Sequence, residues 1–173
     1  MDEIKTILMY TLPVILFALF FILIIWYLVS LYHRRIRKED ARENKRATLN
    51  LRLQAYERLM LFLERIDPIQ LTARIQPDDI PAEQYRRVLL ENIREEFDHN
   101  ITQQLYVSQT LWGQIKSAKE SVVGLVNAAA GELDRQAPAL ELAAAILKRR
   151  SANEQGLVEP AIRHLKKEVA ELF

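Results

Sequence analysis

The residues that could carry chemistry are few and scattered. The chain has three histidines and no cysteine, so a cysteine nucleophile is excluded. Glu96 and His99 are three residues apart and share one helix face, a spacing found in carboxylate-bridged metal sites of helical bundles. Such a site needs a second Glu/His pair and two further glutamates, and no glutamate precedes His164 at the matching offset. Glu95, four residues before His99, offers the simpler explanation of an ordinary helix contact.

We therefore predict that the protein is not an enzyme, with no catalytic residue, no cofactor and no metal ligand. A metal-dependent helical-bundle enzyme built around Glu96 and His99 is the alternative. There is no glycine-rich phosphate loop and no zinc-type spacing, and the chain has only four glycines. Its 24 basic and 23 acidic residues give a net charge of +1. We expect no nucleic-acid binding, because no basic face able to neutralise several phosphates is apparent.

The longest apolar segment lies near the amino terminus. From Thr6 to Tyr32 the chain contains no Asp, Glu, Lys, Arg or His. A hydrocarbon core roughly 30 Å thick needs about 20 apolar residues in a helix. This segment predicts a transmembrane helix, and we place the boundary of the first domain at 1–33. A cleaved signal peptide fits less well, because its apolar region would be only about 7 to 15 residues long.

Positive charge is distributed unevenly around this segment. Lys5 alone precedes it, whereas a cluster of basic residues follows it, including Arg34, Arg35, Arg37 and Lys38. Cytoplasmic flanks are enriched in Lys and Arg. We therefore expect a single-pass protein of a bacterial inner membrane with its amino terminus outside and its carboxy-terminal domain in the cytoplasm. These four residues are also candidate contacts to the membrane surface.

Residues 34–173 are predicted to form an all-α domain of about four to five helices. Leu49, Leu53, Tyr56, Met60 and Leu63 follow coiled-coil spacing, and this helix should end at Asp67 because Pro68 follows it. Further helices are expected from near Pro81 to about Gly113 or beyond, across 117–131, over 139–150 and from near 157 or 160 to the end. Each carries an apolar stripe at helical spacing.

The stretch 101–115 is the most unusual part of this domain, because it contains no charged residue. We predict that it belongs to the helix that begins near Pro81. A helix without a charged face should be covered, either by the other helices of the domain or by a second copy or another partner. The candidate interaction residues are Ile101, Gln104, Leu105, Ser108, Leu111 and Trp112.

Two groups of residues suggest a family. The first is Leu53-Gln54-Ala55-Tyr56-Glu57-Arg58-Leu59 with Glu64-Arg65-Ile66. The second is Phe97-Asp98-His99-Asn100 with Thr102-Gln103-Gln104-Leu105-Tyr106 and Leu111-Trp112. With these blocks the chain resembles an uncharacterised family of small bacterial single-pass membrane proteins with a cytoplasmic helical domain. That resemblance implies no activity, so no functional residue is carried over. The layout also resembles the stalk subunit of rotary ATP synthases, but five prolines from Pro68 to Pro160 would interrupt such a rod.

These observations predict a non-catalytic, membrane-anchored helical scaffold or accessory subunit. Its expected partners are the lipid bilayer and either another protein or a second copy of the chain. Besides the metal enzyme, the other alternative is a sensor of anionic lipid surfaces that acts through the basic cluster after Tyr32.

Overall fold

The computed structural model describes residues 2–152 and 156–172, although the side chains of 2–15, 18, 34–42, 44 and 45 lie outside the description. Every regular element in the described part of the chain is a helix, so the all-α prediction is confirmed. The elements are α1 (Asp2–Ile66), α2 (Pro68–Arg74), α3 (Ala82–Asn100), the short 3₁₀ helix η1 (Ile101–Leu105), α4 (Gln109–Ala130), α5 (Ala139–Ser151) and α6 (Glu159–Ala170).

The prediction of an N-terminal transmembrane helix is corrected. Among the residues whose side chains are described, no helix has both the length and the apolar character needed to cross a bilayer. Crossing a hydrocarbon core roughly 30 Å thick takes about 20 consecutive apolar residues in one helix, and the part of the chain with described side chains supplies no such run.

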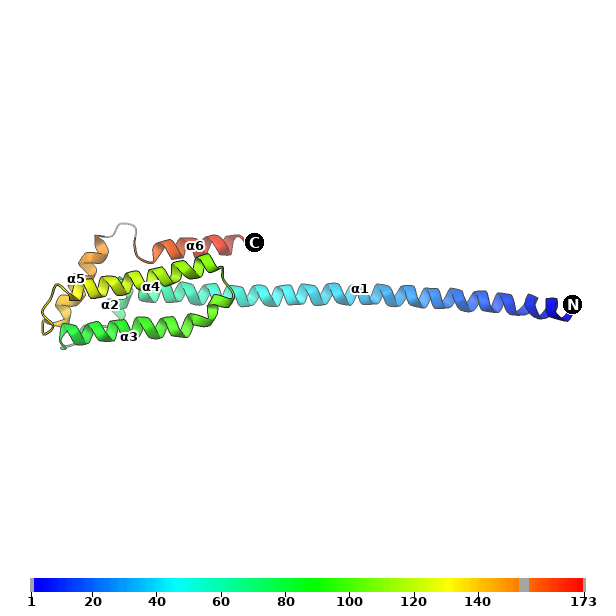
Figure 1. The fold of residues 1–173 in the computed structure, drawn as a ribbon, viewed down its shortest axis with the longest axis horizontal. Coiled ribbons are helices and arrows are strands. Elements are labelled where there is room, and N and C mark those ends of the chain that lie inside the picture. The colour runs from blue at the N-terminus through cyan, green and yellow to red at the C-terminus, as the bar shows by residue number, and fades with distance from the viewer. Residues whose placement is uncertain (1, 153–155, 173) are drawn as a thin grey trace. The chain divides into compact units, whose positions relative to one another are not determined.

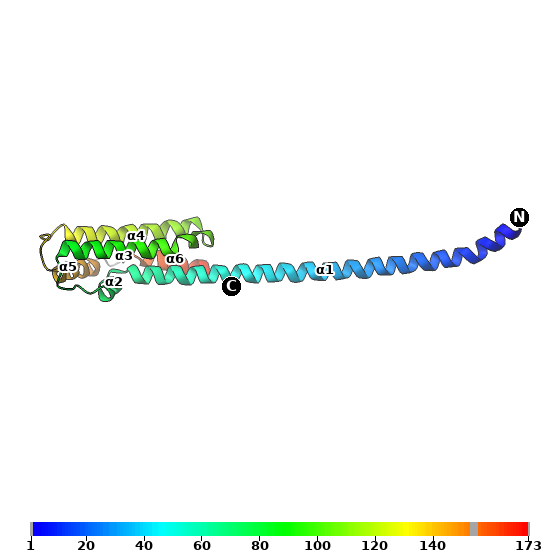
Figure 2. The same cartoon turned by 90° about the horizontal axis from the view of Figure 1, so that it is seen from below.

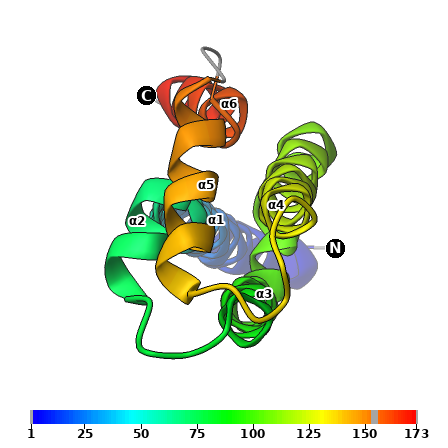
Figure 3. The ribbon, with the colours of Figure 1, turned by 90° about the vertical axis from the view of Figure 1, so that its left-hand side faces the viewer.

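Contacts divide the chain into two compact units, Met1–Leu49 and Asn50–Phe173. In the second unit the last turns of α1 run beside α3 and α4 (Figures 1 and 2). Viewed along the bundle, α5 runs between α2 on one side and α3 and α4 on the other, and α6 lies at the top of the view (Figure 3). This arrangement is a helical bundle.

The core of the bundle draws on every helix of the second unit except η1. On α1 the coiled-coil stripe is buried at Tyr56 and Leu63 and half-buried at Leu49, Leu53 and Met60, and the neighbouring Leu59 is also buried. Three aromatic rings form a run across the bundle: the ring centroids of Phe62 and Phe97 lie 5.9 Å apart, and those of Phe97 and Trp112 lie 5.4 Å apart. The other large buried side chains include Ile66, Leu71, Tyr85, Leu89, Ile93, Leu111, Ile115, Leu142 and Ile146.

The predicted helix boundaries hold where proline or an N-cap sets them. Asp67 ends α1 and caps α2, where its Oδ1 accepts a hydrogen bond from the Ile69 amide at 3.0 Å. α3 starts after Pro81 and α5 after Pro138, and these two prolines form an isolated antiparallel bridge. The amide of Ala82 donates to the carbonyl of Ala137 at 2.8 Å. This backbone bond satisfies one free amide of the first turn of α3, where no side chain caps the helix.

The turn before α6 depends on a glycine. Gly156 has a φ of 72°, a conformation that costs other residues more because they carry a Cβ. A Cβ at this position would also overlap the side chain of Glu159. Pro160 then occupies the first turn of α6, where its missing N–H has no helical partner to lose.

The expectation of one long helix from Pro81 past Gly113 is wrong. α3 ends at Asn100, η1 follows, and α4 begins at Gln109. The Asn100 side-chain amide donates to the carbonyl of Glu96 at 2.8 Å. The Ser108 hydroxyl accepts from the Leu111 amide at 3.0 Å. Asn and Ser compete with the helical backbone for hydrogen bonds and favour helix ends, so the uncharged stretch contains a turn between two helices.

Glu83, in the first turn of α3, is expected to titrate far below an ordinary glutamate. Arg86 donates to its carboxylate at 2.8 and 2.9 Å, and Arg87 donates at 3.1 Å. Hydrogen bonds from Arg86, followed by those from Arg87, lower the pKa of Glu83 from 4.5 to about 2. Because the folded pKa is the lower one, the stabilisation is present above about pH 4.5 and is lost as the pH falls towards 2.

Carbon-detected NMR titration of the Glu83 carboxyl group measures this value directly. The variant Arg86→Gln serves as the comparison, and its Glu83 midpoint should move up towards 4.5. A midpoint near 4.5 in the unsubstituted protein would contradict the geometry.

Candidate functional site

The Glu96 and His99 pair does not form a cluster of metal-ligating groups. The Glu96 carboxylate accepts hydrogen bonds from Arg65 Nη1 at 3.1 and 3.2 Å, and Arg74 Nη1 lies 3.7 Å away. His99 is exposed near the end of α3. Within the described residues, no three His, Asp or Glu side chains are placed to hold a metal ion. Glu96 therefore links α3 to α1 and α2 through arginines.

The six predicted interaction residues separate into two groups. Leu111 and Trp112 lie in the core, with exposed fractions of 0% and 8%. The exposed ones are Ile101, Gln104, Leu105 and Ser108. Among these, Leu105 on η1 is 77% exposed. The four predicted membrane-surface contacts, Arg34, Arg35, Arg37 and Lys38, have side chains outside the described residues.

A polar cluster joins α1, the turn before α4 and α6. Arg52 Nη2 donates to the Tyr56 hydroxyl at 3.0 Å, and this hydroxyl donates to Glu168 Oε2 at 3.1 Å. The Ser108 hydroxyl donates to Glu168 Oε1, and Arg52 Nε donates to the Tyr106 carbonyl at 3.3 Å. Burial raises the pKa of Tyr56 above 10.0, and Glu168 reinforces the rise while Arg52 opposes it. Tyr56 is therefore a neutral donor, and the cluster fixes α6 against α1.

This cluster contains a serine, a histidine and a glutamate, but its order differs from that of a hydrolytic triad. In a triad the imidazole lies between the carboxylate and the serine and takes the serine proton. Here the Glu168 carboxylate lies in the centre, because Oε1 accepts from Ser108 and is 3.4 Å from His164 Nε2. The Ser108 hydroxyl is also occupied as the cap of α4. The arrangement positions helices and does not activate a nucleophile.

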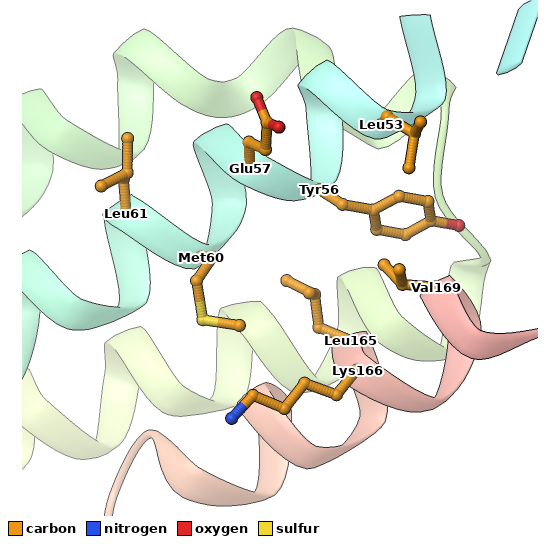
Figure 4. Close-up of a pocket in the computed structure, with 8 residues that line it drawn as sticks. All are labelled: Leu53, Tyr56, Glu57, Met60, Leu61, Leu165, Lys166 and Val169. Carbon is orange, nitrogen blue, oxygen red and sulfur yellow. The ribbon is translucent and has the colours of Figure 1, made fainter. Parts of the chain in front are cut away.

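An open apolar groove of about 590 Å³ runs beside this cluster, between α1 and α6. Figure 4 shows Met60, Leu165 and Val169 in the space between the two helices. Leu61 and Glu57 belong to the α1 side, and both are exposed. The full lining is Leu53, Tyr56, Glu57, Met60, Leu61, Leu165, Lys166 and Val169.

The side chains that line the groove are suited to contact an apolar surface, and few of them carry polar or ionisable groups. Five of its eight lining residues are Leu, Met or Val, and its only ionisable groups besides Tyr56 are Glu57 and Lys166. Glu57 comes from α1 and Lys166 from α6 (Figure 4), so an occupant of the groove meets one negative and one positive charge on opposite sides. An apolar face with charged edges is what an amphipathic helix presents to a groove.

Sequence reasoning identified parts of this groove but not the groove itself. Leu53 and Met60 belong to the apolar stripe predicted for the first helix, and the last helix was also predicted to carry an apolar stripe. Nothing in the spacing indicated that these two stripes meet, because they are more than 100 residues apart along the chain. Glu168 was missed entirely, since its hydrogen-bond donors Tyr56 and Ser108 come from distant segments and nothing near it in the sequence indicates them.

The fold and the groove define a small all-α bundle with an open apolar groove, and its described part has no cluster of side chains that could hold a metal ion. The family described as "Family of unknown function (DUF7935)" matches residues 2–172. The chain belongs to this family, in agreement with the expected membership of an uncharacterised one. No curated protein and no solved structure matches the chain.

Proposed function

We propose that residues 50–173 form a non-catalytic protein-binding module, and that the α1–α6 groove receives an amphipathic helix of a protein partner. The observation that carries the proposal is the open apolar groove itself. Met60 and Leu53 are only half-buried, and Leu61 is 56% exposed, so an apolar occupant would remove their remaining surface from water.

The rigidity of the groove walls supports this role. The Tyr56–Glu168 and Ser108–Glu168 hydrogen bonds join segments that are 112 and 60 residues apart. Because α6 is held to α1 by these contacts, the groove is formed before any partner arrives. A preformed site does not have to spend binding free energy on ordering its own helices.

The groove is a better candidate than the exposed part of the 101–115 stretch. Ile101 and Leu105 are exposed singly on η1, and isolated apolar residues on a surface are common in proteins without a binding role. The groove instead gathers apolar residues from two helices into one concave surface. Concave, mostly apolar surfaces are typical of binding sites.

Site-specific photo-crosslinking in cells tests the proposal. A photoreactive amino acid at Leu61 is expected to attach a protein, and the product should disappear when Met60→Glu places a charge in the groove. Leu140 on α5 is the matched control, because it is also an exposed leucine on a helix, at 67%. A protein crosslinked at Leu105 but not at Leu61 would show that the partner binds at η1 and not in the groove. Equal crosslinking at Leu61 and Leu140 would also reject the groove, because the attachment would then be non-specific.

A further inference from the structure

We infer that the helix received by the groove is α1 of a second copy of this chain, in a pair related by a two-fold axis. The inference rests on the proposed function, because it identifies the partner of the same groove. In a two-fold interface every contact occurs twice. If one residue of the first copy contacts another residue of the second copy, the same two residues also meet with the copies exchanged. The surface must therefore be complementary to itself in spacing, shape and charge.

The spacing on α1 meets this requirement. Four of the five members of the coiled-coil stripe of α1 lie in the second unit, and within the bundle these four divide into two sets. Tyr56 and Leu63 are buried at 2% and 0% exposure, whereas Leu53 and Met60 are half-buried and line the groove. Leu53 and Met60 are seven residues apart, the repeat with which one helix packs along another. The bundle thus leaves one row of this stripe available to a second helix.

The shape of the face is consistent with the same pairing. Leu61 follows Met60 on the outer side of α1 and stands at the edge of the groove, more than half exposed. The groove is lined by Leu and Val side chains of similar size. In two copies placed face to face, Leu61 of each copy would insert into the groove of the other, as a knob packs into a hole.

The charges provide the strongest argument. Glu57 and Lys166 are both exposed, and neither has an ion-pair partner in the described part of the chain. One lies on each side of the groove (Figure 4). In a two-fold pair whose axis runs parallel to the groove, the two sides of the groove are exchanged, so Glu57 faces the partner's Lys166 and Lys166 faces the partner's Glu57. Two ion pairs form from residues that have no other partner, and like charges do not meet.

Charge reversal tests this pairing. We expect sedimentation of the full chain to show a dimer, and Glu57→Lys or Lys166→Glu alone to weaken its dissociation constant by about tenfold or more, because like charges then meet twice. The double variant restores the opposite charges and should return the dissociation constant to within about threefold of the original. Glu141→Lys, on the exposed side of α5, is the matched control and should have no effect.

Because the chain has no cysteine, disulfide trapping provides a second measurement on a clean background. Copies carrying Glu57→Cys are mixed with differently tagged copies carrying Lys166→Cys, and a mixed disulfide is expected after mild oxidation. Glu141→Cys replaces one partner in the control mixture. All these positions are exposed, and circular dichroism confirms that each variant is folded.

The outcomes separate this inference from the proposed function. A monomer, a dimer that ignores both single reversals, or a double variant that does not recover overturns the second-copy inference. A foreign protein crosslinked at Leu61 would then leave the protein-binding role intact. Absence of any crosslink at Leu61 together with a monomer overturns both.

Discussion

Replacing Arg150 with alanine is expected to lower the free energy of unfolding by about 3–5 kcal/mol, because it leaves a buried carboxylate without its partner. Arg150 Nε donates to Asp67 Oδ2 at 3.1 Å, and their side chains are 15% and 11% exposed. Arg150 Nη2 also donates to Glu159. Burial alone would lower the pKa of Arg150, but Asp67 and Glu159 outweigh it and raise that pKa above its ordinary value.

The position of Asp67 explains why the effect should be large. Its carboxylate caps α2 through the Ile69 amide while it receives Arg150 from the end of α5. Glu159 extends the contact to the start of α6, so one guanidinium joins three segments. Loss of Arg150 removes these hydrogen bonds together and leaves the Asp67 charge in a poorly solvated position.

Chemical denaturation followed by circular dichroism measures the change. Lys148→Ala is the matched control, because it removes a basic residue two positions earlier that is exposed, and surface changes of this kind stay within about 0.5 kcal/mol. Combining Arg150→Met with Asp67→Asn should recover much of the loss, since asparagine also caps helices and the buried Asp67 charge is gone, while the Glu159 carboxylate left behind is 36% exposed and can be solvated. A loss below about 1 kcal/mol for Arg150→Ala would refute the argument.

Trp112→Ala is expected to cost about 3–5 kcal/mol of unfolding free energy, the range for removing a large buried aromatic side chain. Trp112 is 8% exposed, and its ring stacks on that of Phe97 at an interplanar angle of 24°. The Lys119 ammonium lies 4.7 Å from the centre of the Phe97 ring. Truncation would leave a cavity where α3 and α4 pack together.

Leu105→Ala is the matched comparison, because Leu105 comes from the same uncharged stretch but is 77% exposed. Its effect should stay within about 0.5 kcal/mol. Denaturation of both variants under the same conditions gives the difference directly. Similar costs for the two substitutions would show that the stretch is not divided into a core part and a surface part as the structure describes.

Local signals in the sequence determined much of the helical framework. Pro68 ends α1, Pro138 precedes α5, and the apolar stripe on α1 supplies Tyr56 and Leu63 to the core. These features depend on interactions within a few residues, namely the geometry around proline and the helical repeat that brings every third or fourth side chain to one face. They can therefore be recognised without knowledge of the rest of the fold.

The break between α3 and α4 shows where local reasoning was too weak. The apolar residues around 101–115 keep helical spacing, which favoured one long helix. Asn100 and Ser108 are residue types that favour helix ends, and both can be read from the sequence. These helix-end signals favour a break, whereas the apolar spacing favours one continuous helix. Tertiary packing decides for the break, because it places Trp112 against Phe97 and the Ser108 hydroxyl on Glu168.

The groove and the polar cluster beside it belong to the tertiary structure alone. The Tyr56–Glu168 contact joins residues 112 positions apart, and the Arg150–Asp67 contact joins residues 83 positions apart. Such pairs depend on how the helices pack and on the balance between burial and the entropy of closing long loops. Composition and periodicity therefore determined that the chain would form amphipathic helices, whereas packing determined which apolar residues remained open to a partner.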